Sequence, residues 1–199
     1  MSFYAFMKKL LAGLIRKLWR VRVCGEENES EGTAYLICAN HQSLLDVVLL
    51  GASIKHNPKY MAKKELTKIP LLWQLIKALG AFPVDRKGSD VGAIKKAIAT
   101  VKEGKSVGIF PQGHRYPKVD PRSTPIKNGS GLIISRAECD VVPVYILRKK
   151  NTFRLFKKTY VIIGDKIDFA TLKGKDNAEI TNIVFDAICT IGENSDIKL

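Results

Sequence analysis

Between Ser2 and Arg20, apolar residues recur at intervals of three and four positions, with basic residues opposite, which predicts an amphipathic helix. Charges interrupt every apolar run before it reaches the roughly 20 residues that a membrane span needs. A signal peptide would end in a cleavage site of small residues, and no such site follows this segment. The pattern is typical of a helix that lies in a membrane interface, and the alternative is a helix packed on the core of the domain. The apolar positions are Phe3, Phe6, Met7, Leu10, Leu11, Leu14, Ile15 and Leu18.

After this helix, short apolar runs that are typical of strands alternate with helical patterns along the chain. The runs predict strands at 21–24, 34–39, 82–84, 106–110, 141–147 and 160–163, with a strand end at 61–62. Helices are expected at 43–53, 71–79, 90–103, 129–137 and 178–191. This alternation predicts an α/β sandwich around a largely parallel or mixed sheet. A length of 199 residues fits a membrane-interface helix, residues 1–20, followed by one domain, residues 21–199.

Charge and cysteine content narrow the partners and the compartment. Lysine and arginine total 33 against 19 acidic residues, a net charge of +14. Such a chain is expected to meet an anionic partner: nucleic acid, an anionic membrane, a phosphorylated substrate or an acidic protein. The four cysteines are scattered, which favours free thiols in a reducing compartment. Three histidines without an H-E-x-x-H or cysteine cluster predict no metal site.

The segment from Asn40 to Asp46 carries the strongest candidate chemistry. His41 follows an apolar strand, and Asp46 follows it with four residues between. Imidazole accepts protons near neutral pH, and a carboxylate on its other nitrogen fixes the tautomer. No G-x-S-x-G motif supplies a protein nucleophile, so His41 is expected to activate a hydroxyl of the substrate. The alternative, a Ser43–Asp46 capping box at a helix start, is compatible with this, because it would point Asp46 back toward His41.

Two further segments offer weaker signals. Arg86 ends an apolar run, and its planar guanidinium would suit a phosphate, although a surface pair with Asp85 is the plainer interpretation. The strand at 141–145 contains Pro143, which favours an edge strand without chemistry.

A fourth segment, 110–115, follows a buried strand. Gln112 offers an amide, Gly113 allows close approach of the backbone to a ligand, and Arg115 offers a cation. Its alternative is an ordinary turn between a strand and a loop.

In chain order, these four segments read N-H-x-x-x-x-D, G-x-F-x-x-[DR]-R, F-P-x-G-x-R and V-x-P-V. This order resembles the motifs of the lysophospholipid acyltransferase family, which includes the 1-acylglycerol-3-phosphate acyltransferases. The resemblance covers roughly residues 34–145 and identifies 21–199 as an acyltransferase domain. One departure is that the third motif usually reads F-P-E-G-T-R, whereas this chain has Gln112 and His114.

The resemblance implies a role for each matching residue. His41 corresponds to the catalytic base and Asp46 to the carboxylate that orients it. Pro143 corresponds to a position that shapes the acyl side. The residues that correspond to acceptor-binding positions are Arg86, Gln112, Gly113 and Arg115.

The resemblance also implies a reaction. A fatty acyl group would pass from a thioester, acyl-CoA or acyl carrier protein, to the free hydroxyl of 1-acylglycerol-3-phosphate (lysophosphatidic acid), giving phosphatidic acid in phospholipid biosynthesis. Neither a metal nor another cofactor would be needed. The enzyme would lie on the cytoplasmic face of a membrane as a peripheral or monotopic protein, in contact with anionic lipids.

Other functions stay open at this stage. The acceptor could be glycerol-3-phosphate or another lysophospholipid, or the chain could bind lipids without catalysis. A nucleic-acid-binding protein is the remaining alternative, but the interleaved basic and aromatic residues of RRM or OB domains are missing, so no nucleic acid is expected as partner. The basic turn at 148–158 would suit the phosphates of a polymer or of a membrane.

Overall fold

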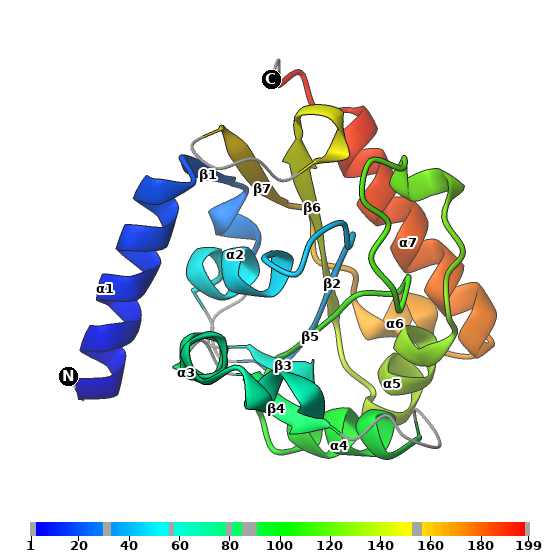
Figure 1. Ribbon diagram of the computed structural model, residues 1–199. Coiled ribbons are helices and arrows are strands. Elements are labelled where there is room, and N and C mark those ends of the chain that lie inside the picture. The colour runs from blue at the N-terminus through cyan, green and yellow to red at the C-terminus, as the bar shows by residue number, and fades with distance from the viewer. Residues whose placement is uncertain are drawn as a thin grey trace.

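A seven-stranded sheet with helices on both faces forms the fold (Figure 1). The computed structural model describes residues 3–29, 33–55, 58–78, 81–84, 91–152 and 157–197. The strands are β1 Val21–Cys24, β2 Leu36–Ala39, β3 Lys59–Lys63, β4 Ala81–Val84, β5 Val107–Ile109, β6 Val141–Arg148 and β7 Thr159–Ile163. The helices are α1 Phe3–Leu18, α2 Asp46–Ser53, α3 Pro70–Ala78, α4 Val91–Lys102, α5 Gly129–Ala137, α6 Phe169–Leu172 and α7 Asn177–Glu193.

The sheet has the order β1-β7-β6-β2-β5-β3-β4, and only the pairing of β6 with β7 is antiparallel. This confirms the expected α/β sandwich around a largely parallel sheet. Because β6, β2 and β5 are parallel neighbours, their carboxyl-terminal ends lie side by side at the same end of the sheet. Ligands of open α/β sheets bind at this end, so the loops that leave these three strands are where a site is expected.

Alternating side chains of the strands divide the core into two layers. On β2, Ile37 and Ala39 face the layer built with α1, α2 and α3. Leu36 and Cys38 face the layer built with α4, α5 and α7. Side chains of a strand alternate between the two faces of a sheet, so the apolar run of β2 is buried from both sides, as is typical of parallel strands.

Helix α1 packs along α2, and its described apolar side chains divide between the core and the solvent. Ile15 is 4% exposed and belongs to the core, whereas Leu14 and Leu18 are 59% and 37% exposed. One side of the apolar stripe therefore packs on the core, as the alternative interpretation expects, and the other side faces outward; the contact with a membrane interface stays a prediction. No helix in the described part of the chain is long and apolar enough to cross a membrane.

Strand β6 differs from its expected place. It lies between β7 and β2, so Pro143 sits in an interior strand rather than at an edge. The Pro143 carbonyl accepts a hydrogen bond from the Gly164 N–H, just beyond the last residue of β7. Because the N–H and C=O of a strand residue point to the same side, the missing donor of the proline faces the point where β7 ends. A ladder bond lost there costs less than one lost in the middle of the strand.

Candidate active site

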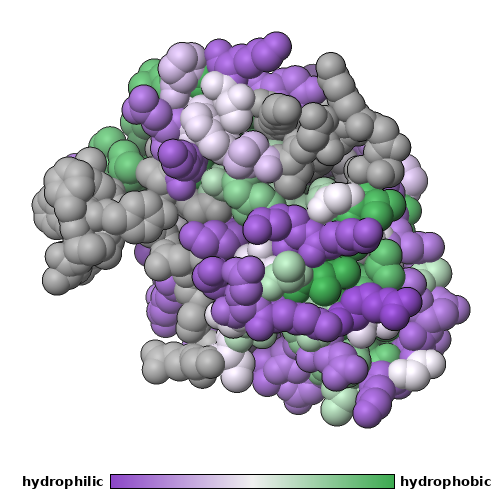
Figure 2. Space-filling view, turned by 90° about the horizontal axis from the view of Figure 1, so that it is seen from below, coloured by the Kyte–Doolittle hydropathy of each residue, from purple (hydrophilic) through white to green (hydrophobic). Residues whose placement is uncertain are grey.

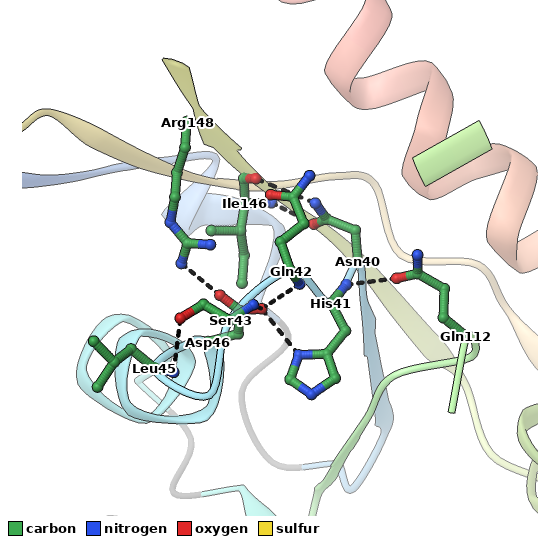
Figure 3. Close-up of polar contacts among 9 residues, drawn as sticks. All are labelled: Asn40, His41, Gln42, Ser43, Leu45, Asp46, Gln112, Ile146 and Arg148. Carbon is green, nitrogen blue, oxygen red and sulfur yellow. Dashed lines mark hydrogen bonds and ion pairs between the residues drawn. The ribbon is translucent and has the colours of Figure 1, made fainter. Parts of the chain in front are cut away.

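His41 and Asp46 lie together where the chain leaves β2 and enters α2 (Figure 3). The Nδ1 atom of His41 is 2.9 Å from Oδ2 of Asp46. An ionised carboxylate only accepts hydrogen bonds, so Nδ1 carries the proton and Nε2 has its lone pair free. The imidazole is 14% exposed and the carboxyl group is fully buried. The imidazole can therefore accept a proton through Nε2 while its other nitrogen is held from behind.

The Asp46 carboxylate also binds the loop that carries His41. Its Oδ2 accepts the N–H groups of Gln42 at 2.7 Å and Ser43 at 2.8 Å, and the Asp46 N–H binds the Ser43 carbonyl. The bond from an acidic side chain back to the N–H three residues earlier is half of a capping box. The other half is missing, because α2 begins at Asp46 with Leu45 as its N-cap, and the Ser43 hydroxyl accepts the Leu45 N–H instead. Ser43 is therefore not the N-cap, and the expected capping box is correct only in the bond by which Asp46 points back toward the loop of His41.

The other oxygen of Asp46 meets a buried arginine. Nη2 of Arg148, at the end of β6, is 2.5 Å from Oδ1. Burial raises the pKa of Asp46, but Arg148, His41 and the Ser43 N–H outweigh it and hold that pKa below its ordinary value of 3.8. The carboxylate is therefore ionised at neutral pH, despite its burial, and is able to stabilise an imidazolium.

An aromatic ring fixes the imidazole from its face. Phe110, the residue after β5, stacks on His41 with ring centroids 3.9 Å apart and an angle of 14° between the planes. The carboxylate holds the imidazole in its plane, and the stacked ring blocks tilting out of that plane. The carboxyl ends of β6, β2 and β5 thus supply Arg148, His41 and Phe110 to one site.

The Gln112 side chain binds the backbone of His41 and is buried. Its Oε1 accepts the His41 N–H at 2.5 Å, and its Nε2 donates to Oγ1 of Thr124 at 2.7 Å. The side chain is buried, with the residue 1% exposed. The structure therefore differs from the expected contact with an acceptor, because both ends of this amide are bonded inside the protein. Because Gln112 lies on the long loop between β5 and α5, its bond to the His41 N–H connects that loop to the loop after β2.

The remaining residues of the expected acceptor site lie on the same long loop or outside the described residues. Gly113 has φ 69°, and a Cβ there would meet the Lys127 side chain at 2.8 Å, so the glycine is needed for the turn itself. Arg115 is exposed, and the N–H of the next residue, Tyr116, binds the His41 carbonyl at 2.9 Å. Arg86 lies outside the described residues.

Two residues to which the sequence assigned no role at the site help to build it: Asn40 of the first motif and Arg148 of the basic turn. The Asn40 amide bonds both the N–H and the C=O of Ile146, which extends the pairing of β2 with β6 by one residue. Arg148, the first residue of the basic turn that the sequence offers to phosphates, is 3% exposed and therefore does not face an external partner. A signal for it was present: Val142, Val144, Ile146 and Arg148 share the parity that faces α2.

The contacts described above involve neither a metal-binding cluster nor a thiol. No group of three or more His, Cys, Asp or Glu residues in the described ranges could hold a metal ion. Cys24, Cys38, Cys139 and Cys189 are free thiols.

A hollow of about 340 Å³ lies at the opposite end of the sheet. Lys59 and Ala81, the first residues of β3 and β4, line it together with Lys77, Lys96 and Lys105. Figure 2 shows the molecule from below, where hydrophilic side chains surround smaller hydrophobic areas. Because β3 is parallel to β5, these amino ends point away from His41, and the hollow is separate from the candidate active site.

Several known proteins resemble this chain. The family described as Acyltransferase matches residues 20–147. The 1-acyl-sn-glycerol-3-phosphate acyltransferase of Bacillus subtilis is 33% identical over 179 residues, which cover 87% of this chain and 88% of that protein. The 1-acyl-sn-glycerol-3-phosphate acyltransferase of Saccharomyces cerevisiae is 31% identical over 165 residues, 81% of this chain but 51% of that protein, so the chain spans about half of its length.

A solved structure bears on the fold alone. It is the crystal structure of the 1-acyl-sn-glycerophosphate acyltransferase from Thermotoga maritima, with a TM-score of 0.75 and 23% sequence identity. The match covers 100% of this chain and 86% of that one. The expected α/β architecture is therefore also that of a protein with this activity in its name.

Proposed function

The chain belongs to the acyltransferase family, and on this premise we propose that it transfers a fatty acyl group from a thioester to the free hydroxyl of 1-acylglycerol-3-phosphate, forming phosphatidic acid. The observation that carries the proposal is the imidazole of His41, which is bonded at Nδ1 to a buried carboxylate and is partly open to solvent. Such an imidazole is built to take a proton from a bound hydroxyl.

In the proposed reaction, Nε2 of His41 takes the proton as the hydroxyl oxygen of the acceptor attacks the thioester carbonyl. The carbon–sulfur bond breaks, and the imidazolium returns the proton to the leaving thiolate, which departs as a thiol. Asp46 stabilises the imidazolium between these steps, and Phe110 keeps the ring in place. No acyl group is attached to the protein, and holding the two substrates in line supplies much of the rate.

A turnover assay tests this function. Purified protein is incubated with lysophosphatidic acid and acyl thioesters of CoA and of acyl carrier protein, and the lipid products are identified by mass spectrometry. Phosphatidic acid is the expected product, and the more active carrier is the donor. Acylation of glycerol-3-phosphate or of another lysophospholipid instead would replace the proposed acceptor. Absence of any acylated product would refute the enzyme assignment.

Arg115 is proposed to hold the phosphate of the acceptor, together with Arg86. Arg115→Ala should raise the KM for lysophosphatidic acid about tenfold or more and change the KM for the thioester little, because lost ground-state binding appears first in KM. Arg136→Ala, on α5 at the other face of the sheet, is the matched control. A raised KM for the thioester alone would assign Arg115 to the donor instead.

The outward side of α1 is proposed to contact an anionic lipid surface on the cytoplasmic side of the membrane. Leu14→Ser with Leu18→Ser should weaken binding to anionic vesicles at least about tenfold, because two exposed apolar side chains would no longer enter the interface. The pair is a sharper change than deletion of the helix, which would also remove Ile15 from the core.

Vesicle co-sedimentation in a salt series measures this binding. Val91→Ser, at another exposed apolar position on α4, is the control and should leave binding unchanged. If the double variant sediments like the wild type, the lipid contact lies elsewhere on the protein.

Gln112→Glu introduces the residue that the family motif usually has. A carboxylate oxygen can accept the His41 N–H as the amide oxygen does, and the Thr124 hydroxyl can turn from the Pro121 carbonyl to donate to the other oxygen. We therefore expect kcat/KM to change by less than about tenfold, or 1.4 kcal/mol. Gln112→Ala is the contrasting variant and should lose more, because the His41 N–H loses its acceptor. Steady-state measurement of kcat/KM for both variants tests these two expectations.

A further inference from the structure

Arg148 is a buried cation at the end of a central strand. It pairs with Thr159 of β7 at the last position of the β6 ladder, and its side chain is 2% exposed. Its parity on β6 is that of Val144 and Ile146, so it points to the layer that contains α2. Arginine is almost never this buried unless it is paired, and a carboxylate that pairs with it here is that of Asp46, at the start of α2.

The contact divides the two oxygens of Asp46 between two tasks. Oδ2 accepts hydrogen bonds from the His41 imidazole and from the N–H groups of Gln42 and Ser43, while Oδ1 accepts one from the Arg148 guanidinium (Figure 3). With both oxygens bound, the carboxylate cannot rotate about its Cβ–Cγ bond without breaking an ion pair. The orientation that Asp46 imposes on the imidazole is therefore set in part from β6, 102 residues away in the chain.

On the basis of the function proposed above, we propose that Arg148 is a positioning residue of the acyl transfer: it locks the Asp46 carboxylate onto His41 and sets the pH range in which the imidazole is free to accept a proton. In this role it acts on His41 through Asp46. The Acyltransferase match ends at residue 147, immediately before it.

The effect on pH follows from charge. A carboxylate alone beside an imidazole favours the imidazolium, which cannot serve as a base. A cation on the far oxygen offsets part of that negative charge, so the neutral imidazole persists to lower pH. Among the described residues, Asp46 from α2 and Arg148 from β6 are charged groups in contact with this unit, whereas Phe110 and Gln112, which also contact His41, are uncharged.

Removal of the charge tests the proposal. In Arg148→Met, the acidic limb of the profile of kcat/KM against pH should move to higher pH by about one unit, with activity partly recovered at alkaline pH. Arg148→Lys keeps the charge and should keep the limb within a few tenths of a unit of the wild type. Ile146→Val, a buried neighbour on the same face of β6, is the control for a merely structural change and should not move the limb.

A second readout does not depend on turnover. NMR of the His41 ring protons across a pH series, without substrate, should show the same displacement of the titration midpoint in Arg148→Met. If that variant does not fold, Arg148→Gln removes the charge while it keeps a hydrogen-bond donor, and the same displacement is required of it. A midpoint that stays in place in the neutral variant overturns the proposal. A displaced midpoint in a protein that fails to acylate lysophosphatidic acid would refute the proposed function instead.

Discussion

Replacement of His41 by alanine is expected to lower kcat by a factor of about 10² to 10⁴, the usual contribution of a general base. The fold should persist. The imidazole is at the surface end of the site, and the Asp46 carboxylate keeps Arg148 and the two loop N–H groups as partners without it. Steady-state assays with lysophosphatidic acid and an acyl thioester measure the loss, and thermal unfolding verifies the fold.

His41→Gln is the companion variant. Glutamine retains polar atoms and much of the volume that stacks on Phe110, but it cannot take a proton near neutral pH. It should therefore be as inactive as the alanine variant. A clean preparation of either variant that keeps more than about a tenth of the wild-type turnover would contradict the role of His41 as base.

Asp46→Asn should have the largest effect on stability. The carboxylate accepts bonds from four groups: His41, the N–H groups of Gln42 and Ser43, and Arg148. An amide has one oxygen and no charge, so in either orientation its NH₂ group faces a donor, and the buried ion pair with Arg148 is broken from the side of Asp46. Breaking a buried ion pair from one side costs about 3–5 kcal/mol of unfolding free energy. Turnover should also fall, though less than in His41→Ala, because a misoriented imidazole remains.

Urea unfolding measures this loss, with Asp140→Asn as the matched control. Asp140 pairs with Lys166 near the surface, where both side chains are about a quarter to a third exposed, so its loss should cost much less. Equal losses of unfolding free energy in the two variants would contradict the larger contribution assigned to the buried Asp46 carboxylate.

The same carboxylate predicts how stability depends on pH. The pKa of Asp46 lies below 3.8 in the folded protein, and an unfolded chain has about 3.9. Between these values the unfolded state binds more protons, so the contribution of Asp46 is complete above about pH 4 and is lost as the pH falls through the folded value. The wild-type unfolding free energy should drop below pH 4 more steeply than that of Asp46→Asn. Parallel curves would contradict this.

Much of the site was determined by local sequence. His41 and Asp46 are five residues apart, and a helix start between them turns the carboxylate back toward the loop whatever lies elsewhere in the chain. Most strands and helices followed in the same way from local periodicity, because the spacing of apolar residues decides which element can bury them. Strand β3, Lys59–Lys63, was expected only as a strand end at 61–62, because lysines on both sides interrupt the apolar pattern. The single turn α6 was not predicted, since four residues are too few for a period to be recognised.

Contacts between distant segments were decided only by the tertiary structure. Arg148 contacts Asp46, and Gln112 contacts the His41 backbone, because β6, β2 and β5 are neighbours in a fixed register. The order and register of strands cannot be predicted from a local sequence pattern. The tertiary structure also determines that Pro143 lies in an interior strand. On α1, it determines that Ile15 is buried in the core and that Leu14 is exposed. Local sequence thus supplied the candidate catalytic pair, His41 and Asp46. The order of the strands determined which distant side chains hold that pair, since burial and ion pairing depend on neighbours that only the folded chain brings together.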